Sequence, residues 1–223
     1  MKKIISFCIY GNNPKYTDAA IANLKLQPII YPGWTCRFYV DGSVPTPIIL
    51  ELEKLGAEVV VMPNAIGHLG MFWRFEPLKD TSIERFIVRD TDSRLNVREA
   101  AAVREWEQLG TNFHIMRDNK AHNVPICGGM WGATSSFINE IKNEYDMLKE
   151  DFIFNHEYMR YSNQRGEYFN FDQPFLWHVI WPKIIRTHTA HIANIDNLRL
   201  YGNERLFPIT NLDNSFVGQP YDI

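Results

Sequence analysis

The first half of the chain alternates short apolar runs with segments whose apolar residues recur at helical spacing. We predict strands from the apolar, β-rich runs at residues 4–10, 35–40, 57–62, 85–89 and 113–116. We predict helices between them, over residues 16–26 and 48–55, and a third that Asn96 caps, with Glu99 at its third position, and that continues through residues 100–109. This alternation is typical of an α/β fold in which a mostly parallel sheet is flanked by helices with right-handed crossovers. Ligands of such sheets bind beyond the carboxyl ends of the strands.

The order of elements changes after residue 118. A glycine-rich segment at residues 127–132 is followed by predicted helices over residues 137–148 and 172–179, and from residue 186 onward no regular structure is predicted. Neither an internal repeat nor a linker divides the chain. The chain has 223 residues, which is an ordinary size for one domain. We therefore expect a single domain over 1–223.

Charge and cysteine usage exclude several classes of protein. Lys+Arg 23 against Asp+Glu 26 gives a net charge of −3, which disfavours a nucleic-acid-binding protein, because that function needs a clustered basic surface. The apolar run at residues 4–10 ends at Gly11 and Pro14, too early for a signal peptide, and no run reaches the roughly 20 apolar residues of a membrane span. With three cysteines and no C-x-x-C pair, we expect reduced thiols and a cytoplasmic protein without a membrane span.

Two carboxylates, Asp90 and Asp92, directly follow the predicted strand 85–89. Side chains two positions apart on an extended segment can turn toward one hard cation, which needs few protein oxygens if phosphates complete its shell. Arg89 and Arg94 flank the pair and add donors that suit phosphate. A D-x-D spacing alone is weak, because a capping Asp followed by a solvated one has the same pattern. Its position at the end of a strand favours a cation site.

The strand order, the acidic pair at a strand end and the lack of a G-x-x-x-x-G-K-[ST] loop resemble glycosyltransferases of the GT-A type, which use nucleotide sugars. A run of motifs is more narrowly similar to a small group of these enzymes, found in bacteria and in large algal viruses that glycosylate their own capsid. The similarity spans nearly the whole chain. The motifs are I-S-F-C-I-Y-G-N-N-P at 5–14, Y-P-G-W at 31–34, G-M-F-W-R-F at 70–75, R-D-T-D-S-R-L at 89–95, F-H-I-M-R-D at 113–118, G-G-M-W-G at 128–132 and F-V-G-Q at 216–219.

This resemblance implies transfer of a sugar from a nucleoside diphosphate sugar, usually a UDP-sugar, to a hydroxyl of a glycan or glycoprotein acceptor. Residues 1–118 would form the nucleotide-binding half, and residues 119–223 would form the half that binds sugar and acceptor.

The resemblance also implies a cofactor, Mn²⁺ or Mg²⁺, between the D-x-D carboxylates and the diphosphate. Asp90 would contact the ribose or the metal, and Asp92 would ligate the metal directly. In enzymes of this kind a histidine far along the chain often completes the shell. Of the two candidates His188 and His191 we favour His191, although a surface histidine is an equally good interpretation of either.

Further residues would bind the nucleotide. Tyr10 and Gly11 leave the first predicted strand where a GT-A fold receives the nucleoside; Tyr10 could stack on the base or belong to the core. Arg74 stands in an aromatic stretch and could bind the diphosphate or ribose, or extend its charge to solvent. Arg89 is a further candidate for the phosphates.

The glycine-rich segment resembles the part of GT-A enzymes that lines the pocket for sugar and acceptor. Gly128 and Gly129 would let the backbone approach the ligand, with Met130 beside them. Trp131 could pack against a sugar face, although a tryptophan is as readily a core residue.

The catalytic residues are predicted from the pair Asp172 and Gln173, which resembles a D-Q pair near the reacting carbon in several glycosyltransferase families. With inversion Asp172 would act as general base, and with retention the pair would flank the donor; an ordinary helix cap is the alternative. Asp118 and His122 are reserve candidates for the base.

Three other functions compete with this interpretation. A phosphatase of the haloacid dehalogenase type carries a similar D-x-D motif, but after its first strand. A sugar nucleotidyltransferase has a related fold, but residues 11–14 lack the glycine-rich basic loop of those enzymes. A carbohydrate-binding module would explain six Trp and ten Tyr and leave the acidic pair unexplained.

Overall fold

The computed structural model describes residues 1–156, 170–195, 198–200, 204–211 and 213–221. Within these residues an eight-stranded sheet has the order β3-β2-β1-β4-β6-β5-β7-β8. β6 is antiparallel to its neighbours β4 and β5, and the other neighbouring pairs are parallel. The predicted α/β fold with a mostly parallel sheet is therefore confirmed. The strands are β1 (Lys2–Ile9), β2 (Thr35–Val40), β3 (Glu58–Val61), β4 (Ile83–Val88), β5 (Phe113–Arg117), β6 (Trp131–Thr134), β7 (His188–Ile192) and β8 (Arg205–Leu206).

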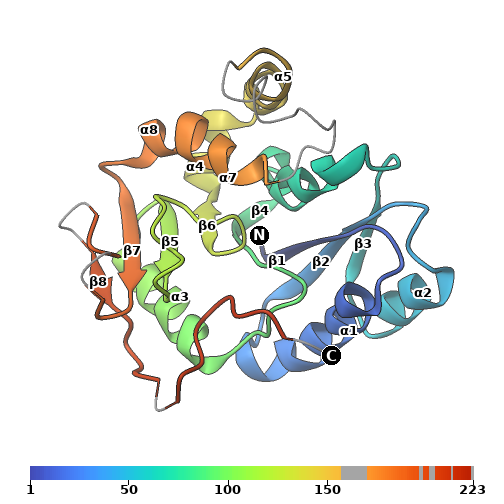
Figure 1. Ribbon diagram of the computed structural model, residues 1–223, viewed down its shortest axis with the longest axis horizontal. Coiled ribbons are helices and arrows are strands. Elements are labelled where there is room, and N and C mark those ends of the chain that lie inside the picture. The colour runs from blue at the N-terminus through green and yellow to red at the C-terminus, as the bar shows by residue number, and fades with distance from the viewer. Residues whose placement is uncertain (157–169, 196–197, 201–203, 212, 222–223) are drawn as a thin grey trace.

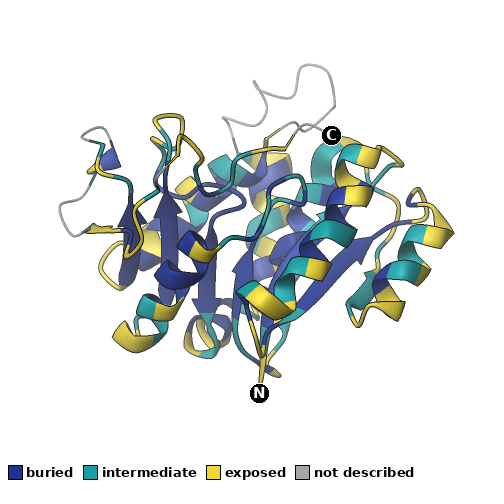
Figure 2. Ribbon diagram, turned by 90° about the horizontal axis from the view of Figure 1, so that it is seen from below, coloured by how far each residue is buried: buried dark blue, intermediate teal, exposed yellow. Residues whose placement is uncertain are grey.

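Helices cover both faces of the sheet (Figure 1). One face carries α1 (Pro14–Ile30), α2 (Thr46–Lys54) and α3 (Val97–Leu109). The other face carries the 3₁₀ helix η1 (Gly67–Lys79), α4 (Ser135–Ile141), α5 (Tyr145–Asn155), α7 (Asp172–Phe175), the π helix η2 (Leu176–Ile180) and α8 (Trp181–Ile184). Figure 2 shows the consequence: the central strands are buried along their length, and the helices expose only their outer sides. None of the described helices is both long and apolar enough to cross a bilayer.

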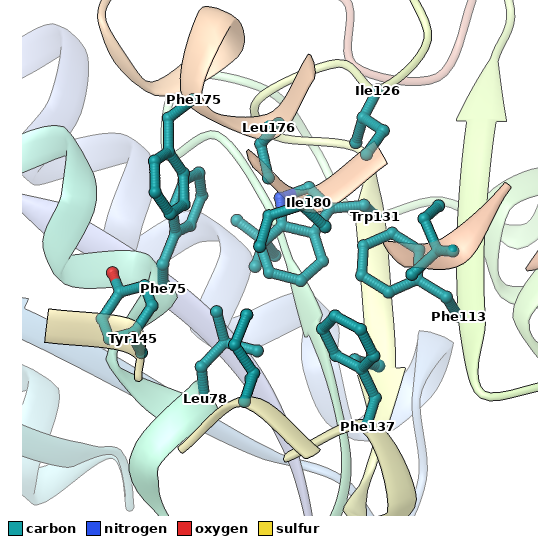
Figure 3. Packing of buried hydrophobic residues seen from close by; sticks show 14 of the residues in the cluster. Phe75, Leu78, Phe113, Ile126, Trp131, Phe137, Tyr145, Phe175, Leu176 and Ile180 are labelled. Carbon is teal, nitrogen blue, oxygen red and sulfur yellow. The ribbon is translucent and has the colours of Figure 1, made fainter. Parts of the chain in front are cut away.

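Trp131 at the start of β6 lies at the centre of the largest of the three apolar clusters among the described residues (Figure 3). Its ring stacks on Phe113 at a centroid distance of 5.1 Å and meets Phe75 and Phe86 edge-on at 5.1 and 5.3 Å. Offset and edge-on pairs of this kind stabilise a core beyond the area that they bury. The second core, on the opposite face, lies between the sheet and α1 to α3.

Several segments differ from the sequence prediction, among them β7 and β8, which lie after residue 186, where no regular structure is predicted. The predicted helix over 137–148 is broken into α4 and α5, because each buries its own apolar side and the chain turns at Glu144, whose N–H donates to the carbonyl of Ile141. The glycine-rich segment leads into β6. This strand has only four residues, and their sequence does not indicate that it pairs antiparallel with its neighbours. The predicted helix over 172–179 is real, but it widens into a π helix after Phe175.

Candidate active site

The acidic pair lies in a loop that a buried asparagine holds in place. The side chain of Asn23 in α1 donates to the carbonyls of Thr91 and Ser93 at 3.0 and 2.8 Å and accepts from the N–H of Leu95 at 3.1 Å. The hydroxyl of Thr91 donates to the carbonyl of Cys8 at the end of β1. The loop after β4 is thus fixed against two neighbouring elements, which keeps Asp90 and Asp92 at the carboxyl ends of β1 and β4.

Arg74 of η1 joins Asp90 to Asp172. Its side chain is 5% exposed, and its guanidinium forms ion pairs with Asp90 Oδ1 and with Asp172 Oδ2, the latter at 2.5 Å. Burial alone would lower the pKa of this guanidinium, but the two carboxylates outweigh it and the pKa is raised. Asp172 Oδ1 is buried and has no hydrogen-bond partner among the described residues. The cluster therefore holds the guanidinium of Arg74 between two carboxylates, and Asp172 Oδ1 is an acceptor that a ligand could use.

Two glycines allow this cluster to form. A Cβ on Gly128 would lie 2.6 Å from Asp172 Oδ2 and 2.9 Å from Arg74 Nη2. A Cβ on Gly129 would lie 2.8 Å from Asp90 Oδ1 and closer still to Oδ2. Both positions require glycine, because the backbone passes too close to the charged groups to leave room for a Cβ atom.

Two cavities meet at Arg74 and Asp90. The first, of about 370 Å³, opens beside the end of β1 and also contains the second carboxylate of the pair. The other, of about 210 Å³, lies against the glycine-rich segment and the start of α7. The first cavity is lined by Cys8, Ile9, Tyr10, Tyr16, His68, Met71, Arg74, Asp90, Thr91, Asp92, Asn170, Gly218 and Pro220. The second is lined by Met71, Arg74, Asp90, Ala121, His122, Cys127, Gly128, Gly129, Met130, Asn170, Asp172, Gln173 and Gly218.

The C-terminal segment closes one side of both cavities. In Figure 1 it runs from the β8 side of the sheet back to α1. The N–H of Tyr221 donates to the backbone carbonyl of Asp92 at 2.9 Å, and the guanidinium of Arg94 lies over the Tyr221 ring at 5.1 Å. Gly218 lines both cavities. The motif at 216–219 was noted in the sequence without a role, and its contacts place it beside the acidic pair.

Of the two residues predicted to bind the nucleoside, Tyr10 lines a cavity and Gly11 does not. Tyr10 lines the first cavity, with its hydroxyl 3.2 Å from His68 Nδ1 and its ring edge-on to Trp73. Burial raises the pKa of the Tyr10 hydroxyl, which therefore stays protonated at neutral pH. Gly11 has a positive φ of 77° and donates its N–H to Ser43; neither cavity includes it in its lining.

The two reserve candidates for the base have different surroundings. Asp118 is buried and accepts from Arg98 at 2.9 and 2.6 Å and from the N–H of Val217, so it anchors the C-terminal segment instead of facing a cavity. His122 lines the second cavity, and its Nδ1 accepts from the N–H of Asp118 at 3.0 Å. Burial lowers the pKa of His122. A neutral ring in this position carries its proton on Nε2 and faces the cavity as a donor.

Two predicted ligand-binding residues are structural. Trp131 is fully buried among the aromatic residues of the core, with its indole N–H donating to the carbonyl of Gly128, so the interpretation of this ring as a sugar platform is corrected. Arg89 is 1% exposed and pairs with Glu99 of α3 and with the Tyr31 hydroxyl. Its side chain points into the sheet–helix interface because it continues the inward alternation of β4. For Trp131 the burial agrees with the core alternative that the sequence left open, and the Arg89 side chain is directed to α3 instead of to either cavity.

The predicted third metal ligand does not join the acidic pair. His191 in β7 is buried, with its Nδ1 2.8 Å from His114 Nε2 and its Nε2 3.6 Å from Glu105 of α3. His188 has its Nδ1 3.0 Å from the carbonyl of Ile184. In the described part of the chain, no group of three His, Cys, Asp or Glu side chains is arranged around one ion.

The acidic pair still fits a hard cation. It supplies two carboxylates on a cavity wall, and Mg²⁺ or Mn²⁺ sites of this kind take their remaining oxygens from phosphate and water. The structure brings the predicted ligands Asp90 and Asp92 to one cavity, and it does not bring His191 to that cavity.

Comparison with known proteins supports the fold. No protein-family profile and no curated protein sequence matches the chain. Among solved structures, a glycosyltransferase involved in the glycosylation of the major capsid of PBCV-1 aligns with a TM-score of 0.53 at 15% identity, over 86% of this chain and 82% of that chain. A Bacillus anthracis protein assigned as a glucose-1-phosphate thymidylyltransferase, in complex with sucrose, aligns with a TM-score of 0.53 at 11% identity, over 87% of each chain.

A third structure is more distant. It is the glucosyl-3-phosphoglycerate synthase from Mycobacterium tuberculosis in complex with Mn²⁺, UDP-glucose and phosphoglyceric acid, with a TM-score of 0.44 at 13% identity over 67% of each chain. The resemblance in sequence motifs is thus confirmed at the level of the fold, which this chain shares with a glycosyltransferase and with a nucleotidyltransferase-like protein.

Proposed function

We propose that the protein is a metal-dependent glycosyltransferase that moves a sugar from a nucleoside diphosphate sugar, with UDP-sugars as the first donors to test, to a hydroxyl of a glycan or glycoprotein acceptor. One observation carries the proposal: Asp90 stands where two cavities meet, with Arg74 bound to it and to Asp172. A donor that spans the boundary would place its nucleoside in the first cavity and its sugar at the second, where the acceptor also enters.

The acidic pair would hold the cofactor. Asp90 and Asp92 would bind Mn²⁺ or Mg²⁺, which supplies positive charge to the departing diphosphate when it is bound. Tyr10 offers an aromatic face and a hydroxyl to the nucleoside in the first cavity. Arg74 contributes a fixed positive charge whose position does not have to reorganise during the reaction.

Asp172 and Gln173 would act on the sugar side. Both line the second cavity, and Gln173 Oε1 lies 3.4 Å from the N–H of Gly128. In an inverting reaction the unpartnered Oδ1 of Asp172 would accept the proton of the acceptor hydroxyl while the acceptor oxygen attacks the anomeric carbon; the bond from that carbon to the diphosphate oxygen breaks, and the diphosphate leaves with the electron pair. In a retaining reaction the same pair would flank the donor face. The anomeric configuration of the product, read by NMR, separates these two mechanisms.

A sugar nucleotidyltransferase is the second candidate, favoured by the fold shared with the Bacillus anthracis protein. The products distinguish the two activities. We expect incubation with a panel of UDP- and GDP-sugars and Mn²⁺ to release the nucleoside diphosphate, with the sugar transferred to an acceptor or to water. Formation of pyrophosphate from a nucleoside triphosphate and a sugar 1-phosphate, without release of nucleoside diphosphate from any sugar nucleotide, would replace our proposal with the second candidate.

A further inference from the structure

Each carboxylate of the acidic pair already has a positive partner within the chain. Asp90 is paired with Arg74, and Asp92 Oδ2 lies 3.1 Å from the ammonium of Lys15. Lys15 is the second residue of α1, after the capping residue Asn13 and Pro14, and thus lies near the carboxyl end of β1. Nothing in the motif pattern of the sequence singles this lysine out.

We propose that Lys15 is an exchangeable counter-cation of Asp92: it pairs with this carboxylate before ligands bind, and its ammonium would move to the diphosphate when Asp92 takes up the metal ion. The inference rests on the proposed function and adds to it a residue that couples cation binding to nucleotide binding. Its consequence is that the free protein binds a divalent cation weakly, and binds cation and nucleoside diphosphate together.

The two internal cations differ in how easily they can move. The Arg74 side chain is 5% exposed and bonded to two carboxylates, so removing it would leave buried charges unpaired. The Lys15 side chain is 34% exposed and the Asp92 side chain 16% exposed. The pair is only partly buried, so water and salt compete with it more than with the buried pairs of Arg74. Breaking the Lys15–Asp92 pair therefore costs less than breaking either pair of Arg74, which stays in place.

Charge counting explains why an exchange is needed. The carboxylates of Asp90, Asp92 and Asp172 carry three negative charges, and Arg74 and Lys15 carry two positive ones, so these five described groups together have one excess negative charge. A bound divalent cation alone would make the net charge of these groups positive. A nucleoside diphosphate bound with the cation would make it negative again. Two like charges close together are unfavourable in a partly buried site. Lys15 beside the cation would be such a pair unless a phosphate lies between them.

The destination of the ammonium follows from the cavity. Asp92 lines the first cavity, as does Tyr16, the residue after Lys15, whose ring centroid is 5.9 Å from the Lys15 ammonium. A phosphate that completes the shell of a cation on Asp92 would lie beside this group. Lysine binds phosphate as a mobile point charge, which suits a side chain that changes partner.

The test compares Lys15→Met with Lys25→Met, which removes the same charge from an exposed position on the same helix. Binding of Mn²⁺ to nucleotide-free protein is followed by electron paramagnetic resonance of the free ion, and binding of UDP at saturating Mn²⁺ by calorimetry. We expect Lys15→Met to bind Mn²⁺ alone about two- to fivefold more tightly, the size of one exposed ion pair, and UDP at least about threefold more weakly. Lys25→Met should match the wild type in both.

The outcomes also separate this inference from the proposed function. If the wild type binds UDP only with Mn²⁺ and Lys15→Met equals Lys25→Met in both titrations, the role of Lys15 is refuted and the function stands. Weaker binding of Mn²⁺ alone by Lys15→Met would refute the exchange as well, because it would make the lysine a support for the metal site. A wild type that binds no nucleotide with Mn²⁺ would refute the proposed function itself.

Discussion

Replacing Gly129 with alanine adds one methyl group at the point where the backbone comes closest to Asp90. The new Cβ would lie 2.8 Å from Asp90 Oδ1 and closer to Oδ2, whereas ordinary contact begins at 3.4 Å, so the carboxylate has to move by more than about 0.6 Å. Gly129 does not have a positive φ, so alanine introduces no backbone strain. The effect of the substitution therefore comes from the displaced carboxylate and from the ion pair that it makes with Arg74.

The expected magnitude follows from this displacement. Overpacking at a well-packed site costs about 1–3 kcal/mol of unfolding free energy. A shift of about 1 Å in a catalytic group costs roughly 100-fold in rate. We expect Gly129→Ala to lower the free energy of unfolding within that range, and to lower kcat/KM with the donor by roughly 100-fold.

The assay uses urea unfolding for stability, calorimetry for binding of UDP with Mn²⁺, and release of nucleoside diphosphate for turnover. Gly42→Ala is the matched control, because its Cβ would meet only the side chain of Asn64, at 3.3 Å, in an exposed turn. Wild-type UDP affinity and turnover in Gly129→Ala would refute the reasoning, since Asp90 would then not need its observed position.

Three further predictions concern stability. Arg74→Met should cost about 3–5 kcal/mol of unfolding free energy, because it leaves Asp172 buried without its cation, and the double variant with Asp172→Asn should recover part of that loss in urea unfolding. Trp131→Ala should cost about 3–5 kcal/mol, yet the folded variant should keep its UDP affinity in calorimetry, because the ring lines neither cavity. Burial lowers the pKa of His191 from 6.5 to about 4 and that of His114 well below its usual range. Between pH 6.5 and 4 these histidines bind more protons in the unfolded chain than in the folded protein, so the free energy of unfolding should fall as the pH is lowered through this range. The fall, measured by urea unfolding at several pH values, should be shallower in His191→Asn.

The fold could be predicted because its signals are local. Each of the five predicted strands has its own apolar run, and the acidic pair directly follows one of these runs, so its position at the carboxyl end of β4 is also a local signal. β6 could not be predicted, because its four residues follow a glycine-rich turn and pair with strands that lie at other points of the chain. The break between α4 and α5 depends on packing in the same way.

The candidate site was only partly accessible from the sequence. Arg74 and Asp172 are 98 residues apart, and nothing local to either residue indicates that they form an ion pair. The side-chain directions of Trp131 and His191 could not be predicted for another reason. A side chain on a strand changes face when the strand shifts by one residue, and the register is set by the partner strand. Asn23 carried a usable signal: it lies on the same helical face as Ala19, Ala20 and Leu24, so a polar group there has to find a buried partner.

The central claim, a cation-dependent nucleotide site at the acidic pair, is tested most directly by calorimetric titration of UDP with and without Mn²⁺. Asp92→Asn is compared with Asp18→Asn, which neutralises an exposed carboxylate on α1. We predict that the wild type and Asp18→Asn bind UDP with Mn²⁺ and lose at least about tenfold in affinity without it, while Asp92→Asn binds as weakly with the ion as without. Equal UDP binding with and without Mn²⁺, or equal binding by the two variants, would contradict the account.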